Sequence, residues 1–472
     1  MKSGVLFIAL GAFTSTASIA AQERTEHQKK AYDIYEKVIS IRTARGHQQV
    51  PTMVNYLVSE LRDAGFGDDA IEVTDYDSDG EPTQGLIVRY AAEGESVAKP
   101  IVLLAHMDVV DALPEDWELN PFELTGKDGY FFGRGTTDNK YGVTNLTATF
   151  IRLKQEGFAP RRDVYLVFSG DEETGMISTR AQADYVAQKI DPDLVLNSDA
   201  GGGLLAPDGT PLYYAVQGAE KTFATFELTV TNEGGHSSRP RADNAIYDLA
   251  DALKKIEVFE FPVRHSELTR TYFEAAGKVT PGELGAAMRA FAVDPTDKMA
   301  IKALRSNPAA VGTTGTTCVA TMLRAGHAEN ALPQSATATV NCRIFPGVGA
   351  AATEAMLRKV VDNEQIEFTL MTNVTESPES KLRPDVLSAI EASLAAAGID
   401  APVVPYMESG GTDGMHYRTK GYDTVAISGA WSKSSDMYAH GLNERLAVNS
   451  FYDGLDHWYV ILKQLAGPPV SQ

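Results

Sequence analysis

Strand-like runs alternate with helical patterns through the first half of the chain. Runs rich in apolar residues lie at 101–105, 163–168 and 193–198, and an alternating run lies at 86–90. Apolar residues recur at helical spacing in 28–65, which predicts two helices closing on Gly65. Strands that are apolar on both faces and alternate with helices are typical of a mostly parallel sheet in an α/β domain.

From about residue 217 the pattern changes to the strict alternation of a half-buried sheet. Alternating strands at 223–231, 316–323, 335–344 and 366–371 are combined with helices at 244–256 and 356–361. This order, β-α-β-β-α-β, is that of a ferredoxin-like unit. We therefore expect a small α+β domain at 218–378, inserted into a larger α/β domain made of 22–217 and 379–472.

One stretch inside the predicted insertion exceeds the ferredoxin-like plan. Residues 262–315 carry helical patches and several Pro and Gly, and the pattern assigns them no role. After residue 384 the larger domain resumes with a helix that ends at Gly398, a strand at 423–428 and a final helix. Two domains also agree with the length of 472 residues, which is too great for a single core.

The N-terminus has the layout of a secretory signal peptide at 1–21. One positive charge, an apolar centre at 5–13 and small residues ending in Ala20 and Ala21 occur in that order. The centre is too short to span a bilayer, and no later apolar run reaches membrane length. We expect an exported protein, periplasmic or secreted, with no membrane span.

Charge and cysteine content exclude several classes of partner and site. The chain has 42 Lys and Arg against 63 Asp and Glu, a net charge of −21, which argues against nucleic acid or an anionic membrane as partner. Its two cysteines cannot build a disulfide framework or a four-thiolate zinc site.

Candidate chemistry gathers where the predicted strands of the larger domain end. Ligands of open α/β sheets bind beyond the carboxyl ends of the strands. The groups expected there are His106, Asp108, Asp138, Glu172, Glu173, Asp199 and His440. Carboxylates with imidazoles suit zinc, or a cobalt- or manganese-like ion. Five direct ligands are too many for one tetrahedral ion, but two ions about 3.5–4 Å apart that share a carboxylate accommodate them.

The adjacent acids Glu172 and Glu173 need a cation or a proton to separate their roles, because neighbouring carboxylates repel each other. A metal-bound carboxylate is a poor base, so one of the pair would bind metal while the other takes a proton from water. Taken alone, a His-x-Asp pair is more often structural and an acidic turn is more often merely solvated. Their combination at successive strand ends favours the functional interpretation.

Six ordered motifs carry a resemblance to a known family. They are His106-Met-Asp108-Val-Val, Gly133-Arg-Gly-Thr-Thr-Asp138, Gly170-Asp-Glu-Glu173-Thr-Gly, Asn197-Ser-Asp199-Ala-Gly, Gly235-His236-Ser-Ser and Ala439-His440-Gly-Leu-Asn443-Glu. From about residue 30 to 465 the chain resembles the M20 metallopeptidases, and within them the carboxypeptidase S and N-acyl-amino-acid hydrolase branch.

The resemblance implies two divalent ions, preferably Zn²⁺ with Co²⁺ or Mn²⁺ as alternatives. Glu172 would be the general base and acid, and Asp108 would accept a hydrogen bond from the ring of His106 and orient it. The implied metal ligands are His106 and Asp199 for one ion, Glu173 and His440 for the other, and Asp138 as the bridge.

The inserted domain resembles the lid of that family. His236 would stabilise the developing oxyanion, and Arg343 would grip the terminal carboxylate of the substrate. Asn330 would lie near the substrate, and Gly410 and Gly411 would contact its backbone. Structural alternatives remain for these residues: a capping histidine, a surface ion pair and ordinary turns. The lid would have to close for His236 and Arg343 to reach the metals.

Two departures and two cysteines complete the comparison with the family pattern. Asn139 follows the bridging aspartate where relatives often have a second Asp. His416 is unexpected; it could add a substrate contact, but a non-catalytic surface role is favoured. Cys318 and Cys342 fall on neighbouring lid strands that would pair around Asn330. A cross-strand disulfide is conceivable, but the apolar face favours two buried thiols.

These observations predict a di-metal hydrolase of an amide bond next to a free carboxylate, a carboxypeptidase or dipeptidase. An N-acyl-amino-acid hydrolase is the alternative, because both reactions cut an amide beside a carboxylate. A non-catalytic binding protein on the same scaffold is a third. The substrate would be a small peptide or an N-acyl amino acid. The oligomeric state stays open, with a homodimer possible, because 262–315 could dock a second lid or cover the cleft of its own chain.

Overall fold

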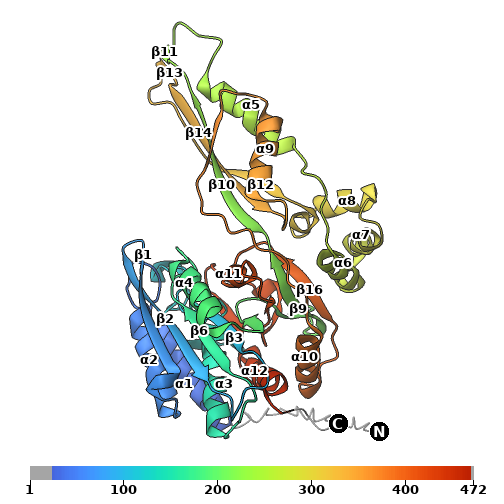
Figure 1. Cartoon of the computed structure of the whole chain (residues 1–472). Coiled ribbons are helices and arrows are strands. Elements are labelled where there is room, and N and C mark those ends of the chain that lie inside the picture. The colour runs from blue at the N-terminus through green and yellow to red at the C-terminus, as the bar shows by residue number, and fades with distance from the viewer. Residues whose placement is uncertain (1–23, 469–472) are drawn as a thin grey trace, which may run out of the picture.

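The computed structural model describes residues 24–468, so the predicted signal peptide lies outside the described residues. Figure 1 shows a larger α/β domain and an elongated lid that projects from it. The chain passes from β9 (Pro211–Glu220) directly into β10 (Thr222–Thr231) of the lid, with only Lys221 between the two strands. It returns to the larger domain between β15 (Glu367–Leu370) and α10 (Pro384–Ala396).

A ten-stranded sheet forms the centre of the larger domain. Besides β9, its strands are β1 (Ile71–Ser78), β2 (Glu81–Tyr90), β3 (Ile101–His106), β6 (Val164–Ser169), β7 (Leu194–Asn197), β8 (Gly202–Leu205), β16 (Val403–Glu408), β17 (Thr424–Ala426) and β18 (Trp431–Lys433). The order is β1-β2-β6-β3-β7-β17-β9-β8-β18, with β16 also paired to β9. Strand β3 is parallel to both β6 and β7, and β17 is parallel to β7. The mostly parallel sheet predicted from the sequence is confirmed.

Helices cover both faces of this sheet. One face packs against α10 and α1 (Glu26–Ser40), α2 (Val50–Asp63), α3 (Lys140–Gln155) and α12 (Val448–Ala466). The other packs against α4 (Ile177–Tyr185) and α11 (Gly414–Arg418). In β3, Leu103 and Ala105 belong to the first core, whereas Val102 and Leu104 belong to the second. Burial on both faces explains why the run 101–105 carries no polar residue.

The lid is a four-stranded antiparallel sheet packed against two helices. Its elements, besides β10 and β15, are α5 (Ala245–Val258), β12 (Thr317–Ala325), β14 (Ser335–Ile344) and α9 (Ala350–Val361). The strand order is β12-β14-β10-β15, which confirms the ferredoxin-like unit. The short strands β11 (Gly235–His236) and β13 (Ala331–Leu332) pair at the tip of the lid, far from the larger domain (Figure 1).

The stretch 262–315 forms three helices with a small core of their own. They are α6 (Glu267–Val279), α7 (Gly282–Val293) and α8 (Lys298–Arg305). Helix α6 lies against β9 and β16 of the larger domain (Figure 1). Tyr213 of β9 packs against the same small core. Within residues 24–468 no helix is long and apolar enough to cross a membrane.

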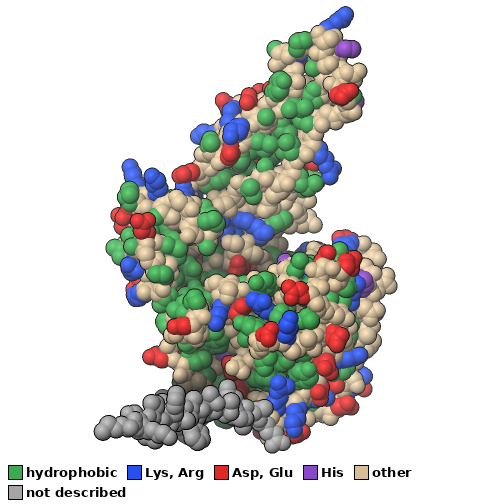
Figure 2. Space-filling view, turned by 180° about the vertical axis from the view of Figure 1, so that it is seen from behind, with side chains coloured by type: hydrophobic (Ala, Val, Ile, Leu, Met, Phe, Trp, Pro, Cys, Tyr) green, Lys and Arg blue, Asp and Glu red, His purple; other side chains and the backbone are tan. Residues whose placement is uncertain are grey.

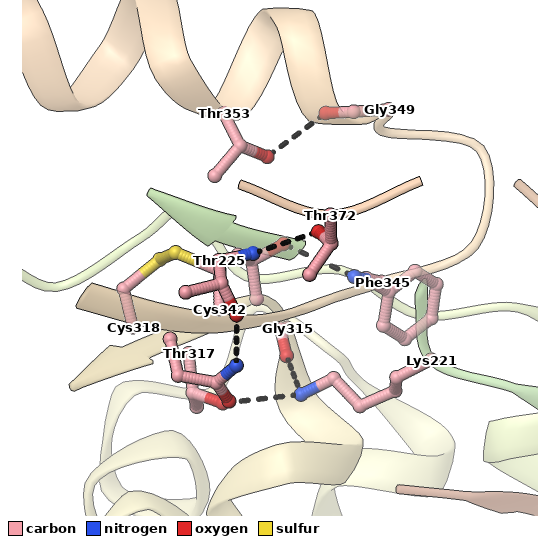
Figure 3. The surroundings of a disulfide bond; sticks show 12 residues. Lys221, Thr225, Gly315, Thr317, Cys318, Cys342, Phe345, Gly349, Thr353 and Thr372 are labelled. Carbon is pink, nitrogen blue, oxygen red and sulfur yellow. Dashed lines mark hydrogen bonds between the residues drawn. A yellow bond between two sulfur atoms is a disulfide. The ribbon is translucent and has the colours of Figure 1, made fainter. Parts of the chain in front are cut away.

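Cys318 and Cys342 form a disulfide bond, so the preference for two thiols is wrong. The two residues lie directly opposite each other on β12 and β14, with their Cα atoms 4.1 Å apart, a separation that brings the sulfurs together. Figure 3 shows this bond near Lys221, whose ammonium group donates hydrogen bonds to Gly315 O at 2.8 Å and Thr317 Oγ1 at 3.4 Å. The junction between the domains is thereby tied to the base of the lid sheet.

Candidate active site

The five predicted metal ligands lie together beyond the carboxyl ends of β3, β6 and β7. His106 is the last residue of β3, Glu173 lies in the turn after β6, and Asp199 follows β7. Asp138 ends the loop before α3, and His440 comes from the loop before β19 (Arg445–Ala447). Donor atoms of His106, Asp138 and Glu173 all lie within 4.8 Å of one another.

Asp138 uses its two oxygens on opposite sides. Oδ1 lies 2.9 Å from His106 Nε2, which is also 3.3 Å from Asp199 Oδ1. Oδ2 lies 3.1 Å from His440 Nε2, which is also 2.8 Å from Glu173 Oε1. The side chains therefore form two donor groups that share one carboxylate.

This donor set fits two divalent cations. Bonds of about 2.0–2.2 Å to zinc place neighbouring donors of a tetrahedron roughly 3.3 Å apart, close to the separations seen here. Imidazole with carboxylate is the ligand chemistry of zinc and similar ions. A carboxylate that faces both groups is the feature that a two-ion site requires.

Electrostatics favour protonated histidines as long as no metal is bound. Hydrogen bonds to Asp138 and Glu173 raise the pKa of His440 to about 10. Although burial opposes it, Asp199, Asp108 and Asp138 raise the pKa of His106 well above its usual range. A metal ion must displace these protons, so metal affinity rises with pH.

Glu172 lies buried beside this cluster in the same turn as Glu173. Burial is the main cause that raises the pKa of the Glu172 carboxyl well above its usual range, with smaller contributions from Asp199 and Asp413. A raised pKa suits a group that must take up a proton near neutral pH and give it back.

The carboxylate of Asp108 holds the Glu172–Glu173 turn. Oδ1 accepts the backbone N–H of Glu172 at 3.1 Å, and Oδ2 accepts that of Glu173 at 3.0 Å. The ring Nδ1 of His106 lies 3.0 Å from the backbone carbonyl of Asp108 and 3.5 Å from its carboxylate. The orienting contact expected from the side chain is thus made mainly by the backbone, while the side chain positions both glutamates.

Glu444 is a positioning residue that the sequence reasoning missed. Strand β19 pairs with β5 (Tyr130–Phe132) and brings this fully buried carboxylate under the loop that carries Asp138. It accepts the backbone N–H groups of Gly135 at 3.0 Å, Thr137 at 2.7 Å and Asp138 at 3.1 Å, and pairs with Arg134 at 2.7 Å. The only sequence signal was its place in the His440 motif, which does not reveal burial.

Asn139 and His416, the two departures from the family pattern, both lie inside the larger domain. The amide of Asn139 donates to Asp199 Oδ1, so this departure from the family pattern places a hydrogen-bond donor on a predicted metal ligand. His416 is buried rather than on the surface, and burial lowers its pKa to about 4, so the surface expectation is wrong. The imidazole is held neutral on the α4 and α11 side of the sheet.

Three of the predicted substrate-binding residues meet near the junction of the domains. Arg343 Nη1 donates to Ser409 O at 2.9 Å, immediately before Gly410 and Gly411. The surface is hollowed between the lid and the larger domain when seen from behind (Figure 2). The guanidinium group of Arg343 therefore lies beside the loop that precedes α11.

The glycine loop is anchored by the two residues that follow it. Thr412 donates to Glu220 from both its N–H, at 2.7 Å, and its hydroxyl, at 2.9 Å. The buried Asp413 accepts hydrogen bonds at 2.8 Å from Ser169 at the end of β6 and from Thr179 of α4. Burial raises the pKa of Asp413 to about 7.

His236 and Asn330 lie together at the opposite end of the lid. His236 is in β11, opposite Ala331 of β13, and Asn330 O accepts the N–H of Ser237 at 3.0 Å. Both residues are exposed, and β11 and β13 form the tip far from the larger domain (Figure 1). In this conformation neither residue is brought to the metal ligands of its own chain.

We predict that Glu444→Gln weakens zinc binding by about 10–100-fold, because a loss of this size is typical when the support of a metal ligand is removed. Competition with a chromophoric chelator measures the affinity. The matched control is Glu115→Gln, an exposed acid in the same domain, which should bind zinc like the unmodified protein. Equal affinities in the two variants would contradict the positioning role of Glu444.

Known proteins are similar to this chain in sequence and in fold. The chain is 28% identical to "Probable carboxypeptidase S-like 2" of Dictyostelium discoideum, over 80% of this chain and 74% of that protein. It is 29% identical to the N-fatty-acyl-amino acid synthase/hydrolase PM20D1 of Xenopus tropicalis, over 77% of this chain and 72% of that protein. An M20 family metallo-carboxypeptidase from Sulfolobus solfataricus has the same fold, with a TM-score of 0.69 at 19% identity over 93% of this chain and 99% of that one.

The family assignment rests on the sequence itself. The model of peptidase family M20/M25/M40 matches residues 102–464, a span that includes all five clustered ligands, Glu172 and the whole lid. The chain therefore belongs to peptidase family M20/M25/M40, whose members are metallopeptidases and related amidohydrolases.

Proposed function

We propose that this chain is a di-metal hydrolase that cleaves an amide bond next to a free carboxylate, as a carboxypeptidase or dipeptidase. The observation that carries the proposal is Asp138, whose two oxygens face two separate histidine and carboxylate pairs, with Glu172 buried beside them. Zn²⁺ is the proposed ion, with Co²⁺ or Mn²⁺ as alternatives.

His106, Asp138, Glu173, Asp199 and His440 would hold the two ions, which when bound would supply Lewis acidity for the amide carbonyl and for the attacking water. Glu172 takes the proton of that water and returns it to the leaving amine. Asp108 keeps Glu172 and Glu173 in fixed relative positions through their backbone N–H groups, so one acid serves as ligand and its neighbour as base.

The carboxylate beside the scissile amide is bound by Arg343, whose planar fork suits a carboxylate. Gly410 and Gly411 contact the backbone of the substrate. Arg343 already lies beside this loop through its bond to Ser409 O, which supports a shared substrate contact at the junction of the domains.

Hydrolysis of N-acyl amino acids is the second candidate function. The similarity to an N-fatty-acyl-amino acid synthase/hydrolase favours it, and the reaction uses the same metals, the same base and the same carboxylate contact. The two functions differ in the group on the acyl side of the amide.

Subunit pairing would bring His236 to the reaction. His236 and Asn330 lie at the lid tip, so we propose that they act at the metal site of a second copy of this chain, where His236 stabilises the oxyanion. Strand β12 supports this pairing because it is an edge of the lid sheet and exposes Val319, Met322 and Leu323 at 61%, 51% and 63%.

We also propose that the chain is exported. The disulfide between Cys318 and Cys342 supports an oxidising compartment, in agreement with the signal peptide predicted at 1–21. Mass spectrometry of the mature protein tests export, and we expect an N-terminus after Ala20 or Ala21. Recovery of the intact Met1 terminus would contradict it.

We predict that substitutions of two neighbouring glutamates differ in what they remove, turnover in one variant and a bound metal in the other. Glu172→Gln should keep both metals and lose about 10²–10⁴-fold in kcat, because only the proton carrier is removed. Glu173→Gln should lose one metal, because a direct ligand is removed. The metal content and the turnover of dipeptides and N-acyl amino acids are measured on the same samples. Near-normal turnover by metal-loaded Glu172→Gln protein would exclude Glu172 as the base.

We predict that two inactive variants complement each other. His236→Ala should lose about 10²–10³-fold in kcat, as for a removed oxyanion donor. After exchange of subunits with Glu172→Gln protein, roughly a quarter of the activity should return, since half the dimers then hold one complete site of two. A mixture no more active than the average of its components would show that His236 acts within its own chain.

A further inference from the structure

A buried ion pair lies where the two domains join, and the proposed reaction assigns it no role. Glu220 is the last residue of β9, immediately before the junction residue Lys221, and Arg418 is the last residue of α11. Their side chains contact each other directly, and each residue is only 2% exposed. Burial lowers the pKa of Arg418 to about 9, which still leaves the guanidinium group charged at neutral pH.

The guanidinium group of Arg418 joins three segments of the chain. Nε donates to Ser377 Oγ at 2.9 Å, and Nη1 donates to Thr424 O at 3.2 Å. Nη2 donates to Glu220 Oε1. Ser377 belongs to the segment 371–383, by which the chain returns from the lid, and Thr424 begins β17. Because the guanidinium is planar and its donors have fixed directions, the three partners are held in one relative arrangement.

The carboxylate of Glu220 joins the pair to the glycine loop, residues 409–413. Oε1 accepts the hydroxyl of Thr412 at 2.9 Å, and Oε2 accepts the backbone N–H of the same residue at 2.7 Å. A Cβ atom added at Gly411 would lie 3.7 Å from Oε2, so the backbone of the loop runs close to this carboxylate. Both oxygens of Glu220 therefore hold the loop, and one of them also holds Arg418.

The two segments that cross between the domains also meet each other here. Ser380 N donates to Gly218 O at 2.8 Å, and Ser380 Oγ accepts the N–H of Thr424 at 3.0 Å. A lid rotation that leaves these bonds and the ion pair intact is confined to Lys221 on one segment and to residues 371–376 on the other. The pair thus lies at the boundary between the part of the chain that can turn with the lid and the part that cannot.

A gain in stability does not by itself explain a buried ion pair. Taking two charges out of water is costly, and apolar residues of similar volume often stabilise a fold equally well. Apolar residues cannot make the directed hydrogen bonds that lead from this pair to Ser377, Thr424 and Thr412. The contribution of the pair is therefore geometric, because it sets the position of the glycine loop relative to the crossing segments.

We propose that Glu220 and Arg418 are positioning residues that couple the glycine loop to both segments crossing between the domains. The loop then keeps its place beside Arg343 while the lid turns about Lys221, so a substrate meets the same surface at every lid position. The inference rests on the proposed function only for the statement that this loop contacts the substrate.

Hydrogen exchange measured by mass spectrometry on zinc-loaded Arg418→Lys protein tests the coupling without turnover. Lysine keeps the positive charge, but a single ammonium group cannot serve three partners as the planar fork does. Among the described residues, the side-chain hydrogen bonds of Arg418 all go outside 409–413, so the loop can loosen only through Glu220. Exchange in 409–413 and in 371–383 should rise together by about tenfold. A rise confined to 371–383 would overturn the proposal.

Two milder variants test each end of the pair if Arg418→Lys protein does not fold. Ser377→Ala removes one partner of Arg418 and should still raise exchange in the glycine loop by about threefold. Thr412→Val removes the hydroxyl that donates to Glu220 and should loosen the loop by about the same factor. Unchanged exchange in the loop of either variant would overturn the proposal.

Kinetics separate this inference from the proposed function. With dipeptides and N-acyl amino acids, Arg418→Lys should raise KM about tenfold and change kcat less than about twofold, because substrate binding weakens while Glu172 and the metal ligands keep their places. The matched control is Leu61→Ala in α2, a fully buried core residue, which should lower Tm and leave KM unchanged. An equal rise of KM in both variants would overturn the positioning role.

The remaining outcomes distinguish the two proposals. A loosened loop with unchanged KM would support the coupling and remove the loop from the substrate contacts of the proposed function. The coupled rise in exchange, without turnover of any probe by the unmodified protein, would support the inference and overturn the proposed function.

Discussion

Crowding of negative charge at the carboxyl ends of the sheet strands is the constraint on which the site depends. Burial raises the pKa of four carboxyl groups there, namely Glu172, Glu173, Asp199 and Asp413. Two imidazoles, His106 and His440, are the positive groups in direct contact with the cluster among the described residues. Divalent cations would supply the charge that keeps the predicted ligand carboxylates ionised, and they would leave Glu172 beside them as an acid still able to exchange a proton.

Three loops at this site are each fixed by a carboxylate that is not one of the predicted metal ligands. Asp108 holds the Glu172–Glu173 turn, Glu444 holds the loop of Asp138, and Asp413 ties the glycine loop to β6 and α4. These acids accept hydrogen bonds from backbone N–H groups or hydroxyls, which satisfies donors that would otherwise be buried without partners. The positions of these loops thus depend on a second set of acids beside the predicted ligands.

Much of the fold and of the ligand set follows from the sequence, because both depend on local patterns. A strand buried on both faces, such as β3, is recognisable in the sequence as an apolar run. The polar residue that ends it must lie at the carboxyl end of the strand, where ligands bind. The role of Glu444 depends instead on the pairing of β19 with β5, which no local pattern encodes. The pairing of Cys318 with Cys342 around Asn330 was foreseen, but the apolar face favoured two buried thiols, and burial alone does not distinguish a thiol from a disulfide. Helical patches in 262–315 were visible in the sequence, but the packing of α6 on β9 and β16 was not.

The two lid residues that the reaction would use lie at very different distances from the junction between the domains. Arg343, the last but one residue of β14, lies opposite Phe223, two residues after Lys221, whereas His236 lies at the far tip. A rotation about Lys221 displaces a residue in proportion to its distance from the junction, so His236 moves much further than Arg343 for the same rotation. Contact between Arg343 and the glycine loop can therefore persist while the tip swings. Under the proposed function, the substrate carboxylate would be recognised at the junction, and the oxyanion contact would come from a larger rearrangement or from another chain.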